Sequence, residues 1–169
     1  MQPLKNHSCR HLVRVCEPTY STSSLNANGV TVHEMAFPDG QNPPSSVLNK
    51  WLDQLEEVEK AQKASGDTDA IAVHCVAGLG RAPVMVAIAL IERGMKPLDA
   101  IDFVRAKRKG AFNNKQIEFL DSYKKRSSKG LSISKSLGKI FRRSTLDSPT
   151  AASSPTAGSS SSTVAQGSH

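Results

Sequence analysis

The chain has no apolar run long enough to cross a bilayer, and only three of its 169 residues are cysteines. A transmembrane helix needs about 20 consecutive apolar residues, so we expect a protein that is soluble or bound only at a membrane surface. An odd number of cysteines (Cys9, Cys16 and Cys75) does not suit a disulfide framework, and no signal peptide precedes them. Both features indicate a reducing, cytoplasmic compartment.

Patterns typical of metal sites are also lacking. The five histidines are scattered, and no two cysteines have the spacing of zinc ligands. We therefore expect neither a metal ion nor another cofactor.

Aromatic residues are few, at 5% of the chain, and none occurs in segment 144–169. This segment is almost wholly Ser, Thr, Ala, Pro and Gly, which bury too little apolar surface to offset the entropy lost on ordering. We predict a disordered tail at 144–169 and one folded domain at 1–127.

Acidic residues are missing from a basic stretch at 124–143, which holds eight Lys and Arg residues. Within it, Ile133, Leu137, Ile140 and Phe141 recur at helical spacing, so 128–143 is predicted to be a basic amphipathic segment. Such a segment suits an anionic membrane surface. A solvated charge run is the plainer alternative. Nucleic-acid binding and nuclear import are further options for such a stretch, although we expect no nucleic-acid partner.

The most informative segment is His74-Cys75-Val76-Ala77-Gly78-Leu79-Gly80-Arg81. A β-like run, Ala70–Val73, leads into it, and an apolar helical run, Pro83–Glu92, follows. A loop between a strand and a helix start presents free backbone N–H groups, and its glycines let the main chain approach a phosphate. The segment therefore predicts an anion cradle built from the N–H groups of residues 76–81.

Two side chains add chemistry to this cradle. Arg81 can bind two phosphate oxygens through its planar guanidinium. The positive field favours the thiolate of Cys75, and a nucleophilic sulfur beneath a phosphoryl group implies hydrolysis of a phosphate monoester through a cysteinyl-phosphate. A buried cysteine that only packs is the plainer alternative.

Strands and helices alternate along the chain. Short β-type runs at His11–Val15 and Val30–Glu34 precede a helix that opens at Ser45, and later helices start near Pro97 and Asn114. The alternation predicts an α/β fold with a mostly parallel central sheet flanked by helices. The cradle then lies at the carboxyl end of a strand, where ligands bind in such folds.

The chain from Leu4 to Tyr123 resembles the phosphatases of regenerating liver (PRL, or protein tyrosine phosphatases type IVA), a branch of the dual-specificity phosphatases. The resemblance rests on Cys75–Pro83, Val13–Glu17 and Gly110–Asn113. It implies the cysteine-phosphatase fold and protein-tyrosine-phosphatase activity.

Three features depart from the family pattern. The family domain begins with two strands and a helix that have no counterpart before Leu4, so we expect a domain shortened at its N-terminus. The family ends in a prenylated cysteine, whereas this chain ends in Gln166–His169, so we expect no prenylation. The acid loop, Met35–Gly40, keeps one of the two aspartates of the family.

The resemblance implies a role for each residue of the site. Cys75 would be the nucleophile, Arg81 the phosphate clamp and Asp39 the general acid, although an Asp before Gly is by itself only a turn residue. His74 would orient Cys75, and Gln116 would position water. Without the resemblance, these two are a histidine at a strand end and a residue on a helix surface.

Two further residues are expected to tune the reaction. Ala82 stands where relatives carry a hydroxyl that is thought to help the thiolate leave, so the resemblance implies slow turnover. It also implies a reversible disulfide between Cys16 and Cys75 that protects the nucleophile from over-oxidation. An inert buried thiol is the alternative for Cys16.

Two functions need the same cradle. A working phosphatase would act on a phosphoprotein or a phosphoinositide. A binding module would accept an acidic loop of CNNM-type magnesium transport mediators, because a carboxylate mimics a phosphate. A non-functional shortened product is the third alternative, and a homo-oligomer is compatible with the first two.

Overall fold

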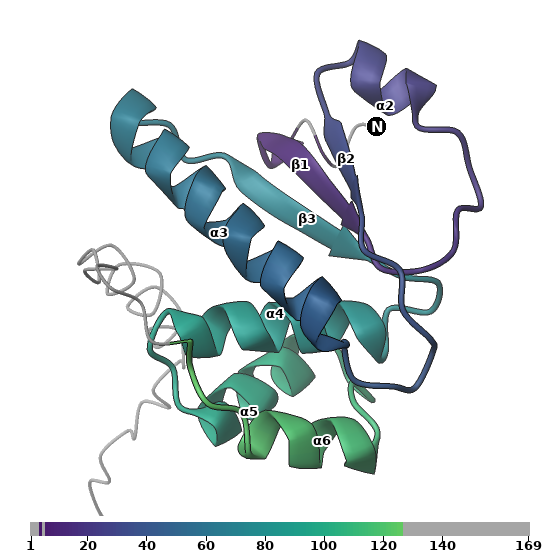
Figure 1. Cartoon of the computed structure of the whole chain (residues 1–169), viewed down its shortest axis with the longest axis vertical. Coiled ribbons are helices and arrows are strands. Elements are labelled where there is room, and N and C mark those ends of the chain that lie inside the picture. The colour runs from purple at the N-terminus through teal and green to yellow at the C-terminus, as the bar shows by residue number, and fades with distance from the viewer. Residues whose placement is uncertain (1–3, 5, 127–169) are drawn as a thin grey trace, which may run out of the picture. The chain divides into compact units, whose positions relative to one another are not determined.

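The computed structural model describes Leu4 and residues 6–126, all within one structural unit, Met1–Ile133 (Figure 1). The expected basic segment 128–143 and tail 144–169 lie outside the described residues. So does position 127, where the domain was expected to end.

The sheet consists of three parallel strands in the order β2-β1-β3 (Figure 1): β1 (Cys9–Arg14), β2 (Thr31–Glu34) and β3 (Ala70–His74). The register pairs Arg14 of the middle strand with Glu34 of β2 and with His74 of β3. Because the strands are parallel, their carboxyl ends lie at one edge of the sheet. The loops that follow them therefore begin side by side.

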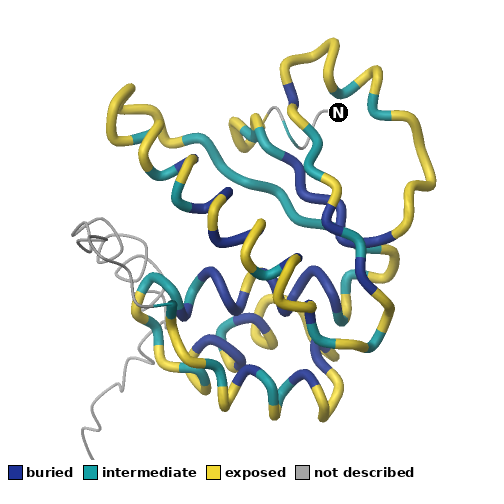
Figure 2. Tube along the Cα trace, viewed as in Figure 1, coloured by how far each residue is buried: buried dark blue, intermediate teal, exposed yellow. Residues whose placement is uncertain are grey.

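Five helices are described besides the strands: α2 (Ser23–Ala27), α3 (Ser45–Ser65), α4 (Arg81–Glu92), α5 (Pro97–Lys107) and α6 (Asn114–Asp121). Helix α4 contacts β3, α3, α5 and α6, and it is the most continuously buried helix in Figure 2. The predicted α/β fold with a parallel sheet flanked by helices is confirmed.

The apolar pattern explains these positions. Nine of the 12 residues of α4 are buried, as expected for a helix that is apolar on nearly all sides. In α3 the buried residues recur at helical spacing, and Trp51 Nε1 donates a hydrogen bond to Met85 O of α4 at 3.0 Å. Helix α5 begins at Pro97 as predicted, and α6 begins at Asn114 behind an Asn113–Gln116 capping box.

Some elements differ from the sequence prediction. Helix α2 was not predicted, because it has five residues and buries none of them, so it carries no apolar periodicity. Strand β1 starts at Cys9 and ends at Arg14, and α4 starts at Arg81, before the predicted apolar run. Among the described residues, no helix is both long and apolar enough to cross a membrane.

Candidate active site

The phosphate loop, residues 75–81, joins the end of β3 to the first residue of α4. This is the strand–loop–helix arrangement that the sequence predicted. Gly78 has a left-handed φ of 70°, and its backbone N–H donates to Cys75 Sγ at 3.3 Å. An amide of the loop thus points at the sulfur, as an anion cradle requires.

Arg81 is buried, with 7% of its surface exposed. Its Nη1 donates to Phe37 O at 3.3 Å. Its buried Nε lies 3.1 Å from one carboxylate oxygen, but the two groups are not aligned as a hydrogen bond. A buried charged donor without an aligned acceptor is costly. The oxygen of a bound anion is the natural partner for this N–H group.

The acid loop lies against the same arginine; from here on it includes Gln41, whose N–H donates to Pro38 O, and so spans residues 35–41. Asp39 Oδ1 is 3.1 Å from Arg81 Nε, close enough for an ion pair, and the Asp39 side chain is 78% exposed. The structure therefore brings the predicted acid and the predicted clamp together. In this arrangement the carboxylate occupies the edge of the guanidinium that a phosphoryl oxygen would use.

His74, at the end of β3, contacts the main chain of the nucleophile. Its Nδ1 lies 3.1 Å from Cys75 O, and its Nε2 lies 2.6 Å from Tyr20 Oη. A carbonyl oxygen only accepts hydrogen bonds, so Nδ1 must carry the proton. In the neutral ring Nε2 then accepts from the hydroxyl of Tyr20.

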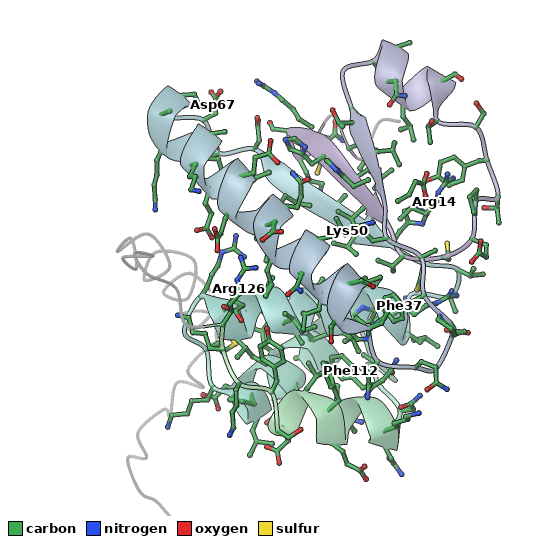
Figure 3. All side chains as sticks on the ribbon, in the orientation of Figure 1. Arg14, Phe37, Lys50, Asp67, Phe112 and Arg126 are labelled. Carbon is green, nitrogen blue, oxygen red and sulfur yellow. The ribbon has the colours of Figure 1, made fainter. Side chains whose placement is uncertain are left out.

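Sequence reasoning missed the residues that hold Tyr20. The guanidinium of Arg14 lies 4.4 Å from the centroid of the Tyr20 ring, and Arg14 Nη1 donates to Tyr20 O at 2.9 Å. Arg14 also forms a two-pronged ion pair with Glu34, whose hydrogen bonds lower the pKa of that carboxyl below its usual range. Figure 3 labels Arg14 beside the loop that carries Tyr20.

Gln116 is completely buried, so the alternative of a helix-surface residue is wrong. Its Nε2 donates to Gln41 O of the acid loop at 3.2 Å. A Cβ added to Gly80 would lie 3.2 Å from the same nitrogen, which is a tight contact. Gln116 therefore touches both loops, and no pattern in the sequence indicates this without the family resemblance.

The remaining predicted residues lie near the same edge of the sheet. Ala82 is buried in the first turn of α4, and Cys16 is buried just beyond β1. Val15 N, beside Cys16, donates to His74 O at 3.0 Å, next to Cys75. All three cysteines are free, and Cys9 lies at the opposite end of β1.

Comparison with known proteins agrees with this geometry. A family model described as protein-tyrosine phosphatase matches residues 4–123. A relative from Dictyostelium discoideum, named "Probable protein tyrosine phosphatase type IVA A", is 54% identical over 121 residues, which cover 72% of this chain and 70% of the relative. Protein tyrosine phosphatase type IVA 3 of Homo sapiens is 48% identical over 124 residues, covering 73% of this chain and 69% of the relative.

A solved structure of a protein tyrosine phosphatase from Leishmania major is also similar. It has a TM-score of 0.67 and 44% identity, covering 73% of this chain and 78% of that chain. Fold, site and relatives define a cysteine-based protein tyrosine phosphatase. Within that class, the chain belongs to the type IVA, or PRL, family.

Proposed function

We propose that Cys75, Arg81 and Asp39 hydrolyse phosphate monoesters in two steps, of which the second is slow. In the first step the Cys75 thiolate attacks phosphorus, the ester P–O bond breaks, and the leaving oxygen takes a proton from Asp39. In the second step water attacks phosphorus, the S–P bond breaks with its electron pair returning to sulfur, and Asp39 takes the proton of the water. Inorganic phosphate is then released.

The observation that carries this mechanism is the hydrogen bond from Gly78 N to Cys75 Sγ at 3.3 Å. An N–H group directed at sulfur stabilises a thiolate more than a neutral thiol. The buried Arg81 Nε adds a hydrogen-bond donor for a phosphoryl oxygen. This donor stabilises the transition state most, because negative charge develops on the phosphoryl group there.

Ala82 supports the slow second step. Its methyl group is buried at the start of α4 and offers no hydroxyl to the departing sulfur. The cysteinyl-phosphate should therefore accumulate during turnover.

A pre-steady-state assay with p-nitrophenyl phosphate tests this mechanism, with Cys75→Ser as the control. We expect a burst of one p-nitrophenol per chain, followed by a low steady rate, and no burst in Cys75→Ser. A linear time course for the wild-type chain, or a variant that retains the burst, would contradict the mechanism.

The physiological substrate is proposed to be a phosphoprotein or a phosphoinositide at the cytoplasmic face of a membrane. The basic stretch at 124–143 supports the membrane location. Arg126 is already paired with Asp53 and Glu56 of α3, so the membrane would meet the other basic residues of the stretch. Binding of the full chain to vesicles with and without anionic lipid tests this proposal, and equal binding to both would contradict it.

A second candidate function is the binding of an acidic loop, as in CNNM-type magnesium transport mediators. The Asp39–Arg81 pair favours it, because a carboxylate already reaches the guanidinium of the cradle. Asp39→Ala should reduce turnover but preserve binding of such a partner, whereas Arg81→Ala should reduce both. Equal loss of partner binding in the two variants would contradict a binding mode that depends on the cradle alone.

Cys16 and Cys75 are also proposed to form a reversible disulfide. The hydrogen bond from Val15 N to His74 O supports it, because it joins the residues that precede the two thiols. After mild peroxide treatment, mass spectrometry should find a linked Cys16–Cys75 peptide that dithiothreitol removes. Oxidation of Cys75 to sulfinic acid with no linked peptide would contradict the proposal, and Cys9→Ser serves as the control.

A further inference from the structure

The segment that connects α5 to α6, together with the first residues of α6, contacts both loops of the active site (residues 108–116). We call it the α5–α6 brace. Within it, the family resemblance implies a role only for Gln116. Successive amides that turn inward around an anion leave the intervening carbonyls pointing outward, and outward carbonyls near other elements need donors.

The brace supplies donors to three consecutive carbonyls of the phosphate loop. Arg108 donates from Nη2 to Ala77 O at 2.7 Å and from Nε to Gly78 O at 3.2 Å. The backbone N–H of Phe112 donates to Leu79 O at 2.8 Å. The outer side of the loop is thus held at every residue from 77 to 79.

The backbone conformation of Phe112 indicates that the surrounding packing holds its N–H group against Leu79 O. Phe112 has a φ of 68°, in the left-handed region that residues with a Cβ atom seldom adopt. Its side chain is buried in the core, with 7% of the residue exposed. A strained backbone persists only where the surrounding packing determines it, and such residues cluster at functional sites.

The brace also holds the acid loop. Asn113 Nδ2 donates to Gly40 O at 3.0 Å, and Gln116 Nε2 donates to Gln41 O at 3.2 Å. The capping box fixes both side chains, because Gln116 N donates to Asn113 Oδ1 and Asn113 N donates to Gln116 Oε1. The same short segment therefore carries the donors for two loops that are far apart in the sequence.

We propose that the α5–α6 brace is a positioning element that sets the general acid and the nucleophile at a fixed distance from each other. Arg108 positions the peptide groups of the phosphate loop, so that their N–H groups aim at the anion and at the sulfur of Cys75. Asn113 positions the acid loop through Gly40, the residue next to Asp39. The proposal rests on the function proposed above, because it assigns positioning residues to that reaction.

The first test asks whether Arg108 holds the phosphate loop through its planar, two-pronged guanidinium or only through its positive charge. Arg108→Lys keeps the charge but lacks the planar fork that reaches two carbonyls, and Lys109→Met removes one positive charge from the next residue. We expect Arg108→Lys to weaken tungstate binding about tenfold, as loss of two hydrogen bonds implies, and to slow alkylation of Cys75 at pH 6. Lys109→Met should match the wild-type chain in both measurements.

The readouts for Arg108 separate positioning from stability. Alkylation is followed on the Cys75 peptide by mass spectrometry as a function of pH, and the melting temperature is measured in parallel. The charged or titratable groups near the phosphate loop include Arg81, Asp39, His74, Tyr20 and Glu34, and none of them is changed. Wild-type tungstate affinity in Arg108→Lys, or an equal loss in Lys109→Met, would overturn the role of Arg108.

Asn113 is tested by Asn113→Ser, which keeps an oxygen to cap α6 but lacks the longer amide group that donates to Gly40 O. We expect the burst rate to depend more steeply on the leaving group across a series of aryl phosphates, because protonation by Asp39 is impaired. Tungstate affinity should stay within about twofold, since no contact to the phosphate loop is lost. If Asn113→Ser does not fold, Asn113→Asp provides the same comparison; an unchanged leaving-group dependence would overturn the coupling.

Failure of the brace is distinguishable from failure of the proposed function. If the wild-type chain shows no burst and binds no tungstate, the proposed function fails. If the wild-type chain shows both and the Arg108 and Asn113 variants match it, only the brace is wrong.

Discussion

At the scale of single residues, Arg81 pairs with Asp39 through the donor that a substrate phosphoryl group is expected to use. Asp39 lies 3.1 Å from its Nε, and a phosphoryl oxygen needs the same donor. The Asp39 side chain is largely exposed, so leaving the guanidinium does not require it to cross an apolar region. Binding of substrate should therefore displace the carboxylate and free it for proton transfer.

Asp39→Asn should separate binding from chemistry. We expect turnover of phenyl phosphate to fall by a factor of about 100 or more, because general acid catalysis is lost. Tungstate should bind more tightly than to the wild-type chain, because the competing charge is gone. Isothermal titration and steady-state kinetics measure the two effects, and weaker tungstate binding would contradict the competition.

Ala82→Ser should speed the slow step. A serine at this buried position adds the hydroxyl that relatives carry there and should raise the steady-state rate severalfold, with the burst amplitude retained. Ala89→Ser adds the same group at a similarly buried position farther along α4, and its rate should not rise. A steady-state rate in Ala82→Ser that is unchanged or lower would count against a slow step set by residue 82.

Tyr20→Phe should act through His74. The variant keeps the ring beside Arg14 but loses the hydroxyl that faces His74 Nε2 at 2.6 Å. The His74 ring is then free to change tautomer or turn, so alkylation of Cys75 at pH 6 should slow about threefold or more, as loss of one hydrogen bond implies. The pH profile of alkylation measures this effect.

The second tyrosine provides the control for this prediction. Tyr123 donates to Glu92 Oε1 at 2.7 Å, on the side of the fold where Arg126 also binds Glu92. Tyr123→Phe should lower the melting temperature and leave alkylation unchanged. Similar alkylation profiles for both variants would show that the hydroxyl of Tyr20 has no positioning role.

At the scale of elements, two histidines join the neighbouring strands β1 and β2. His11 Nδ1 lies 3.1 Å from His33 Nε2, so one ring donates and the other accepts. Burial lowers the pKa of His33, the neighbouring His11 lowers it further, and Glu57 of α3 opposes the change. The fold therefore favours the neutral form of His33.

Acid should weaken this strand pair. Because the folded pKa of His33 lies below its unfolded value of 6.5, the unfolded chain binds more protons as the pH falls below that value. The melting temperature should therefore be highest above about pH 7 and fall between pH 6.5 and the lowered pKa. His33→Asn should flatten this part of the curve, whereas His7→Asn, at an exposed position, should not. Equal curves for the two variants would contradict His33 as the cause of the acid-induced fall in melting temperature.

The elements that the sequence predicted are those whose side chains repeat with a clear period. The stripe of α3 and the continuous apolar run of α4 follow from burial, and Pro97 and Asn114 mark helix starts through local chemistry. Helix α2 buries nothing and so has no pattern to detect. The phosphate loop could also be predicted from local sequence, because the β-like run, the two glycines and the apolar helical run follow one another directly.

The contacts that complete the site could not be predicted in this way. Arg108 binds Ala77 O across 31 positions of the chain, and Tyr20 reaches His74 across 54. Both hydrogen bonds form because the fold brings together polar residues that are far apart in the sequence. No rule based on the spacing of residues predicts such contacts. Asp39 needed the family resemblance, since an Asp before Gly is usual in turns.

At the scale of the whole molecule, the parallel strands place the active-site loops of the described fold at one edge of the sheet, and the opposite edge carries none of them. The acid loop and the phosphate loop follow the carboxyl ends of β2 and β3, and the brace meets them there. The turn between α3 and β3, residues 66–69, lies at the amino end of β3, and Figure 3 labels Asp67 at that end of α3, away from Phe37 and Phe112. Arg10 pairs there with Asp69 at 3.0 Å.

The α3–β3 turn consequently offers an attachment point for a reporter. A Cβ added to the exposed Gly66 would find no atom within 4 Å, so a short Gly/Ser linker carrying a fluorophore tag should be tolerated after this residue with the Arg10–Asp69 pair kept. The tagged chain should show the same burst amplitude and tungstate affinity as the untagged one, and a reduced burst would contradict this. Immobilising the protein through this turn would leave the whole catalytic face open to the solution.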